Sequence, residues 1–220
     1  MITRTQQLDT RSSATHLHVM TIRLAAACLL SLTGCKEVLT KTAAYEPAKA
    51  GSVDQAMCLL GFTAVPLREL LTGHHLVEAT LNGKAASFVV DTGANASVLH
   101  TPYAAEFGIS GKAVGGAIGV GGALKASRAS IRSLDIGGVT IRRDRIMTTD
   151  LGQITNLLGP ISGGKVYGII GQDVLKEHRA IIDVAKPILY LVREDSAPAP
   201  VSADQCGSPA ARAPAKAGAQ

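Results

Sequence analysis

Short runs of β-branched and aliphatic residues recur between residues 65 and 192, and Gly or Asn-Gly steps separate them. Alternating apolar segments at this spacing indicate the strands of an all-β barrel or sandwich. The runs are VPLREL, HLVEATL, ASFVVD, ASIRSLDIGG, VTIRRDRIM, VYGII and AIIDVAKPILYLV. Asn82-Gly83, between the second and third runs, predicts a two-residue hairpin. Two short helices are expected, at 101–107 and 172–178, while residues 151–159 fit either a loop or a turn of helix.

The composition suits one domain and argues against a nucleic-acid partner. Of 220 residues, 46% are hydrophobic and 18% charged, so the chain can bury a core. It has no Trp, four Tyr and three Phe, which leaves few rings for stacking on bases. The 22 Lys and Arg exceed the 17 Asp and Glu by 5, and these charges are dispersed along the chain. We therefore expect no nucleic-acid binding.

The segments on either side of the β-rich region differ from it in composition. Residues 35–64 mix charged residues with Ala and Gly without a sustained period, which predicts a linker. Residues 194–220 are rich in Pro and Ala and hold few large apolar side chains, so they bury too little to offset the entropy of ordering. We expect a domain over 65–193 followed by a disordered tail.

The N-terminus carries the pattern of an export signal. Arg23 precedes a nine-residue apolar run from Leu24 to Leu32, shorter than the roughly 18 residues that span a bilayer. The run leads into LTGC, which resembles the lipobox of bacterial lipoproteins. The resemblance implies a signal peptide over 1–34 and a diacylglycerol on Cys35. An ordinary secretory signal or a short buried helix is the alternative.

The lipobox interpretation implies a place in the cell. Met20 is a better start than Met1, because the residues before it would make an unusually long polar leader. The mature protein would face the periplasm of a bacterial cell envelope and contact the membrane through its lipid. Since Lys36 rather than Asp follows Cys35, we expect sorting to the outer membrane.

The cysteines argue against a structural metal. They stand at positions 28, 35, 58 and 206, and no two have the close spacing of zinc ligands. Cys28 would leave with the signal and Cys35 would carry lipid. Cys58 and Cys206 could then pair in an oxidising periplasm or stay as free thiols, and the sequence leaves both open.

The chemistry of the chain centres on FVVDTGANASVLH, residues 88–100. Asp91 ends an apolar strand, where a carboxylate is costly unless it accepts hydrogen bonds or shares a proton. Gly93 lets the backbone turn so that its N–H can reach that carboxylate. Further along, Ile169-Ile170-Gly171 forms a second apolar turn that would let a strand pass beside the acid loop. Asp-Thr-Gly alone is also consistent with an ordinary Asp that caps the loop at the end of a strand and has no catalytic role.

Together, the acid loop and the later turn resemble the retropepsin-like aspartic proteases, in particular the single-lobe bacterial aspartyl proteases. The resemblance covers roughly residues 65–193 and implies an acid-protease barrel with one or two short helices. LNGKAASFVVDTGANASVL is similar to the first hairpin and active-site loop, and AIGVGGAL to the flap. The flap is richer in Gly than usual in the family and has no aromatic residue at its tip.

The resemblance implies an aspartic endopeptidase, with Asp91 as its catalytic acid and a peptide or protein as substrate. No cofactor and no metal would take part. The implied supporting residues are Thr92, Gly93 and Ala94 in the acid loop, Ile169, Ile170 and Gly171 in the later turn, and Ile118, Gly119, Val120, Gly121 and Gly122 in the flap.

One carboxylate cannot both activate water and protonate the leaving amine, so two are needed. Asp173 follows the Gly171 turn and Asp183 lies within a strand, and both are interpreted as structural. The second acid must then come from another copy, in a homodimer where Asp91 meets Asp91 across the twofold axis. VAKPILYLV, residues 184–192, resembles the strand that these enzymes use for their dimer sheet.

Two other functions remain open. The chain could be a catalytically silent, lipid-anchored module of the same fold that binds peptides or has a structural role. It could also be a monomeric periplasmic β-domain with an incidental Asp91. Peptide cleavage and oligomeric state discriminate between these alternatives.

Two further motifs are set aside. Gly159 to Lys165 fits the spacing of a Walker A loop, but Val166 replaces the Ser or Thr that would bind magnesium, and a strand follows. Adjacent His74 and His75 would point to opposite faces of a strand and could not chelate together. We expect these two, like His100 and His178, to lie on the surface.

Overall fold

The computed structural model describes residues 40–119, 122–192 and 200–207. The expected signal peptide, 1–34, and Cys35 lie outside these ranges, as do Val120 and Gly121 of the expected flap. Within the described ranges, no helix has the length and apolar character needed to cross a membrane.

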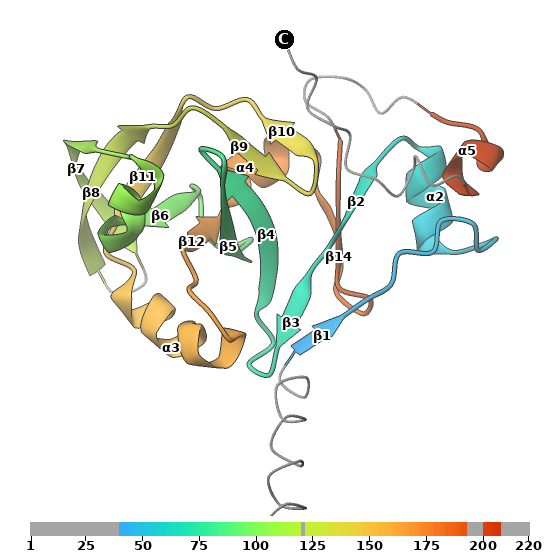
Figure 1. The fold of residues 1–220 in the computed structure, drawn as a ribbon, viewed down its shortest axis with the longest axis horizontal. Helices are drawn as coiled ribbons and strands as arrows, with labels where there is room; N and C mark the ends of the chain where they lie inside the picture. Colours follow the sequence, from blue (N-terminus) through green and yellow to red (C-terminus); the bar gives the residue numbers. More distant parts are fainter. Residues whose placement is uncertain (1–39, 120–121, 193–199, 208–220) are drawn as a thin grey trace, which may run out of the picture. The chain divides into compact units, whose positions relative to one another are not determined.

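Most of the strands form one curled sheet, in agreement with the all-β expectation (Figure 1). The strand order along its main path is β1 (Thr40–Thr42), β3 (Arg68–Leu70), β4 (His75–Leu81), β5 (Lys84–Val90), β12 (Gly168–Ile170), β6 (Val98–His100), β11 (Arg145–Thr149), β8 (Gly122–Ser130) and β7 (Gly111–Gly119). In addition, β9 (Leu134–Ile136) pairs with β4 and with β10 (Val139–Ile141).

The hairpin between β4 and β5 confirms the prediction from Asn-Gly. Asn82 has φ 51° and Gly83 has φ 83°, and a two-residue turn of this kind requires positive φ at both positions. The Asn82 side chain also accepts hydrogen bonds from the N–H groups of Arg132 and Ser133, at 2.7 and 3.2 Å. The turn is thereby joined to the segment between β8 and β9.

Strands β5 and β12 are covered on both faces. They pair in parallel, with Ile169 opposite Val89, and β12 also pairs with β6. Val89 and Ile169 pack into one apolar cluster, whereas Phe88 and Ile170 belong to the larger core on the other face. Burial on both faces explains why these strands are continuous apolar runs rather than alternating ones.

A second, three-stranded sheet corrects the expectation for residues 184–192. Its order is β13 (Ile181–Asp183), β14 (Ile188–Leu191) and β2 (Thr63–Pro66). Strand β14 is fully buried and pairs within the chain on both edges. Its backbone hydrogen bonds are therefore already used inside one subunit, so β14 cannot serve as an open strand of a dimer sheet.

Both expected short helices are present, as η1 (Thr101–Phe107) and α4 (Gln172–Glu177). The undecided segment is a longer helix, α3 (Gly152–Ser162). Ile154, Leu158 and Ile161 recur at helical spacing and pack into the same cluster as Val89 and Ile169. The Walker-like stretch thus begins inside the last turn of α3, whereas a phosphate-binding loop lies before the N-terminus of a helix.

The expected linker and tail contain ordered structure, contrary to the sequence prediction. Helix α2 (Val53–Leu59) lies within the expected linker, and α5 (Ala203–Gly207) lies within the expected tail. A disulfide joins Cys58 to Cys206, and the Val201 N–H donates to the Leu59 carbonyl at 3.0 Å. These contacts hold a segment that could not bury enough apolar surface on its own.

A buried carboxylate connects α2 to the three-stranded sheet. Asp54 is 1% exposed and accepts hydrogen bonds from the Tyr190 hydroxyl, the Lys186 Nζ and the Glu46 N–H. Burial alone would raise the pKa of Asp54, but these hydrogen bonds outweigh it, so its pKa lies below the ordinary value. Burial and the bond to Asp54 raise the pKa of Tyr190.

Two histidines expected on the surface are buried. His100 Nδ1 accepts the Leu151 N–H at 2.9 Å, and its ring meets Tyr103 edge to face. His178 is fully buried, with Nδ1 at 2.8 Å from the Val192 carbonyl. Each ring has a backbone partner that brings it into the interior, and sequence position alone did not reveal those partners.

Candidate active site

Asp91 is the first residue after β5, which ends at Val90. Its backbone N–H donates to the Ile170 carbonyl at 3.0 Å, which continues the parallel pairing of β5 with β12 by one residue. The Ile-Ile-Gly turn therefore lies directly beside the acid loop, as the sequence predicted. The buried strands fix the backbone of Asp91 while its side chain remains partly exposed.

The Asp91 carboxylate is held by the loop that follows it. Oδ1 accepts the Gly93 N–H at 2.8 Å, the contact expected from the sequence. A Cβ at Gly93 would lie 3.1 Å from the same oxygen, so a side chain there would crowd the carboxylate. Among the described residues, no hydrogen bond to Oδ2 is present. One oxygen is therefore oriented and the other is available for a reacting group.

The loop is braced from the opposite side by Gln172, which sequence reasoning missed. Its backbone N–H donates to the Ala94 carbonyl at 2.8 Å, and its Nε2 donates to the Thr92 carbonyl. The available signal was its position immediately after Gly171, at the start of a helix. Thr92 and Gly93 are themselves exposed at the tip of the loop.

Gly171 makes a close backbone contact with the acid loop that leaves no room for a side chain. A Cβ at Gly171 would lie 2.6 Å from the carbonyl carbon and oxygen of Ala96, and 2.8 Å from the Ala94 oxygen. Its N–H donates to the Ser97 hydroxyl oxygen at 3.0 Å. The glycine is therefore required by close approach, and it positions the acid loop directly.

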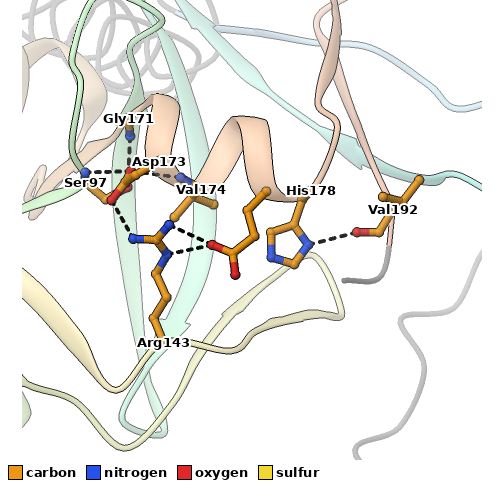
Figure 2. A network of polar contacts seen from close by, with 8 residues as sticks. Ser97, Arg143, Gly171, Asp173, Val174, His178 and Val192 are labelled. Carbon is orange, nitrogen blue, oxygen red and sulfur yellow. Dashed lines mark hydrogen bonds and ion pairs between the residues drawn. The ribbon is translucent and has the colours of Figure 1, made fainter. Parts of the chain in front are cut away.

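A polar network lies behind this contact, and Figure 2 shows it beside α4. Asp173 Oδ1 accepts the Ser97 N–H at 2.8 Å and the Ser97 hydroxyl at 2.7 Å, while Oδ2 pairs with Arg143 Nη1 at 2.8 Å (Figure 2). Arg143 also binds Glu177 through Nε and Nη2. Asp173 thus has the structural role that the sequence predicted.

An apolar wall adjoins the acid loop. Ala94 and Val98 pack against the cluster that contains Val89 and Ile169, and α3 covers that cluster. The floor next to Asp91 is therefore made by β5, β6 and β12, with α3 packed on it.

The expected flap forms a β-hairpin where it is described. Ile118 on β7 pairs with Ala123, and Gly119 pairs with Gly122 on β8. Val120 and Gly121 lie outside the described residues, and the covering role expected for this segment stays a prediction.

Asp183 does not join the site. It lies on β13, and its Oδ1 accepts the N–H groups of Ala185 and Lys186 at 3.0 and 2.9 Å. The described residues form no cluster of three His, Cys, Asp or Glu that could hold a metal ion.

One family model matches the part of the chain that holds both motifs. Residues 77–174 match the family model described as aspartyl protease. The matched stretch is less than half of the chain, and it contains both the Asp91 loop and the Ile169–Gly171 turn. A comparison with curated proteins found no match.

Two solved structures illustrate the structural similarity. A retropepsin-like aspartic protease from Rickettsia conorii is 22% identical, with a TM-score of 0.44; the alignment covers 60% of this chain and 98% of that one. The EIAV protease complexed with the inhibitor HBY-793 is 21% identical, with a TM-score of 0.40; the alignment covers 51% of this chain and 95% of that one.

Proposed function

We propose that this chain is an aspartic endopeptidase whose active site needs Asp91 from each of two copies. The observation that carries the proposal is the construction of the acid loop. Asp91 ends a buried strand, its Oδ1 is oriented by the Gly93 N–H, and Gly171 presses against the loop from behind. The match of residues 77–174 to the aspartyl protease family supports the same function.

In the proposed reaction, one Asp91 carboxylate takes a proton from water as the water oxygen attacks the scissile carbonyl. The carboxyl group of the other Asp91 gives its proton to the carbonyl oxygen, which forms a tetrahedral gem-diol. The first Asp91, now protonated, then gives its proton to the amide nitrogen. The C–N bond breaks while the second Asp91 takes a proton back from one of the hydroxyl groups. No covalent bond to the protein forms.

The second carboxylate is assigned to a partner copy because the nearby acids within the chain are occupied. Asp173 uses both oxygens, on Ser97 and Arg143. Asp183 caps the turn between β13 and β14. Thr92 and Gly93 are exposed at the loop tip, which leaves that tip accessible to a second loop.

The first test compares Asp91→Asn with Asp183→Asn in a peptide-cleavage assay. Asp91→Asn removes the base and should abolish cleavage, whereas Asp183→Asn keeps an acceptor for the turn and should retain it. A statine-type transition-state mimic should inhibit the wild-type protein. Undiminished cleavage by Asp91→Asn would refute the proposed chemistry, and peptide binding without turnover in the wild type would favour the silent module.

A mixing experiment tests the shared site. Wild-type chains are held at constant concentration while Asp91→Asn chains are added and allowed to exchange. If each site needs two Asp91 carboxylates, activity should fall in proportion to the wild-type fraction, because mixed dimers are inactive. Addition of Asp183→Asn chains is the control. Activity that stays constant on adding Asp91→Asn would show that one chain suffices.

We also propose that the protein is a lipid-anchored component of a bacterial cell envelope, sorted to the outer membrane. LTGC before residue 36 supports lipidation of Cys35. The Cys58–Cys206 disulfide supports an oxidising compartment, where such bonds persist. Cys35→Ser should remain unprocessed and take up no labelled palmitate, while Cys28→Ser should still be labelled. Label on Cys35→Ser would refute the anchor.

A further inference from the structure

We propose that a cavity behind the acid loop binds a small carboxylate attached to a short apolar body. The cavity measures about 400 Å³, a size suited to a small ligand. Its apolar wall consists of Ile131, Leu134, Ile146, Met147 and Val174. All but Met147 are buried side chains, so this wall belongs to the rigid interior.

Three arginines contribute to the lining of the same cavity. Arg128, Arg143 and Arg145 line it, against one lining acid, Asp173. Arg128 on β8 lies directly opposite Met147 on β11, and Arg145 is two residues from Met147 on the same strand. Side chains of cross-strand partners and of alternate residues share one face. Arg128 and Arg145 therefore point to the same side as Met147, whereas Ile146, between Arg145 and Met147, points to the buried interior.

These arginines differ in how far their charge is already neutralised. Arg143 is held by Asp173 and Glu177. Arg128 forms no ion pair with any residue whose side chain is described, and Arg145 faces the exposed carboxylate of Asp144 at 3.5 Å. Two guanidinium groups at the cavity thus keep donors for an anion. A carboxylate matches the planar fork of a guanidinium, and the apolar wall accepts the body attached to it.

The position of the cavity links it to the acid loop. Ala96 and Ser97 form part of its wall, together with Asp173, which holds Ser97 in place (Figure 2). A carboxylate bound by Arg128 and Arg145 would therefore lie beside the network that positions Asp91. A regulatory effect on cleavage rests on the proposed function, whereas binding of the carboxylate does not.

The test is a titration of the full chain with N-acetyl-leucine, followed by the backbone amide resonances of Ala96 and Ser97. N-acetyl-leucinamide, which lacks the negative charge, should bind at least about tenfold more weakly, the change expected for loss of one charge-assisted hydrogen bond. Octanoate in place of N-acetyl-leucine distinguishes a fatty acid from a peptide C-terminus as the source of the carboxylate. Inorganic phosphate tests the contribution of the apolar body and should bind more weakly.

Variants assign the site to its arginines. Arg128→Gln combined with Arg145→Gln should weaken N-acetyl-leucine binding by about tenfold or more, while Arg132→Gln, an exposed arginine outside the cavity, should leave it unchanged. Equal binding of the amide and the acid, or no effect of the double variant, would overturn the proposal. Saturable shifts elsewhere but none at Ala96 or Ser97 would also overturn it.

The same titration on Asp91→Asn separates binding from catalysis. We expect unchanged affinity there, so an inactive wild-type protein would refute the proposed function without touching the carboxylate site. For the regulatory effect, N-acetyl-leucine should change the wild-type cleavage rate and not that of the double variant. A saturated site with no change in rate would refute regulation.

Discussion

The Oδ1 atom of Asp173 accepts both the backbone N–H and the hydroxyl of Ser97, although 76 residues separate the two in the chain. The Ser97 hydroxyl oxygen in turn accepts the Gly171 N–H at 3.0 Å. A single serine therefore joins the start of α4 to the end of the acid loop. The geometry of Asp91 depends on this buried link rather than on the Asp-Thr-Gly residues alone.

Ser97→Ala should destabilise the protein by about 1 to 3 kcal/mol, because it leaves the buried Gly171 N–H without its acceptor. Ser97→Thr keeps the hydroxyl and should restore part of the loss. Ser87→Ala is the matched control, since its hydroxyl donates to Glu78 at the surface. Urea unfolding of the three variants measures the effect. Equal midpoints for Ser97→Ala and Ser87→Ala would contradict the role given to Ser97.

Gly171→Ala should lower stability by about 1 to 3 kcal/mol and reduce cleavage, because the new methyl group meets the backbone of Ala94 and Ala96, which cannot rotate away. Gly164→Ala has open space around it and serves as the control. Thermal unfolding and peptide cleavage should both separate the variants. A Gly171→Ala protein with wild-type stability and activity would show that the loops are not in close contact.

Asp54 should make stability depend on pH. Its pKa in the folded state lies below the unfolded value, so its contribution is complete above about pH 4 and is lost as pH falls through the folded pKa. Asp54→Asn should lower the free energy of unfolding by about 1.5 to 3 kcal/mol at pH 7. It should also reduce the loss of stability that the wild-type protein shows below about pH 4. Asp144→Asn, on an exposed carboxylate, is the control. Denaturant unfolding between pH 2 and pH 7 measures the free energy of unfolding at each pH. The same dependence on pH for both variants would contradict the role given to Asp54.

Removing the Cys58–Cys206 disulfide should lower the free energy of unfolding by about 2 to 5 kcal/mol. The double variant Cys58→Ser with Cys206→Ser should match the reduced wild-type protein in thermal stability, and adding reductant should not change the variant further. Non-reducing peptide mapping of the wild type should recover the Cys58 and Cys206 peptides as one species. Free thiols at both positions in protein isolated without reductant would refute the pairing.

Local patterns predicted the hairpin at Asn82-Gly83, the helices η1 and α4, and the contact between the Asp91 loop and the Ile-Ile-Gly turn. Each of these depends on residues close in sequence or on two motifs that a β-fold brings together. Helix α3 could have been predicted too, because Ile154, Leu158 and Ile161 share one helical face. Pro160 and the flanking glycines obscured that signal.

Other features depend on partners that no local pattern indicates. Asp54 on α2 contacts Lys186 and Tyr190, which lie more than 130 residues later, in the turn before β14 and on β14 itself. The Cys58–Cys206 pair orders a segment that composition alone marks as a tail. The burial of His178 likewise depends on the Val192 carbonyl, which another part of the fold provides.

The antiparallel pairing of β2 with β14 sets a condition on biosynthesis. Val65 lies opposite Leu189. Strand β2 is therefore synthesised more than 100 residues before its partner β14, and its hydrogen bonds to β14 can form only after residues 188–191 have been made. During synthesis or export, β2 would present an unpaired edge while the rest of the chain emerges, and exposed edges of this kind invite aggregation. The three-stranded sheet is therefore completed later than the main sheet, whose last strand ends at Ile170, and a chaperone that shields β2 would act on this chain before residue 191 is released.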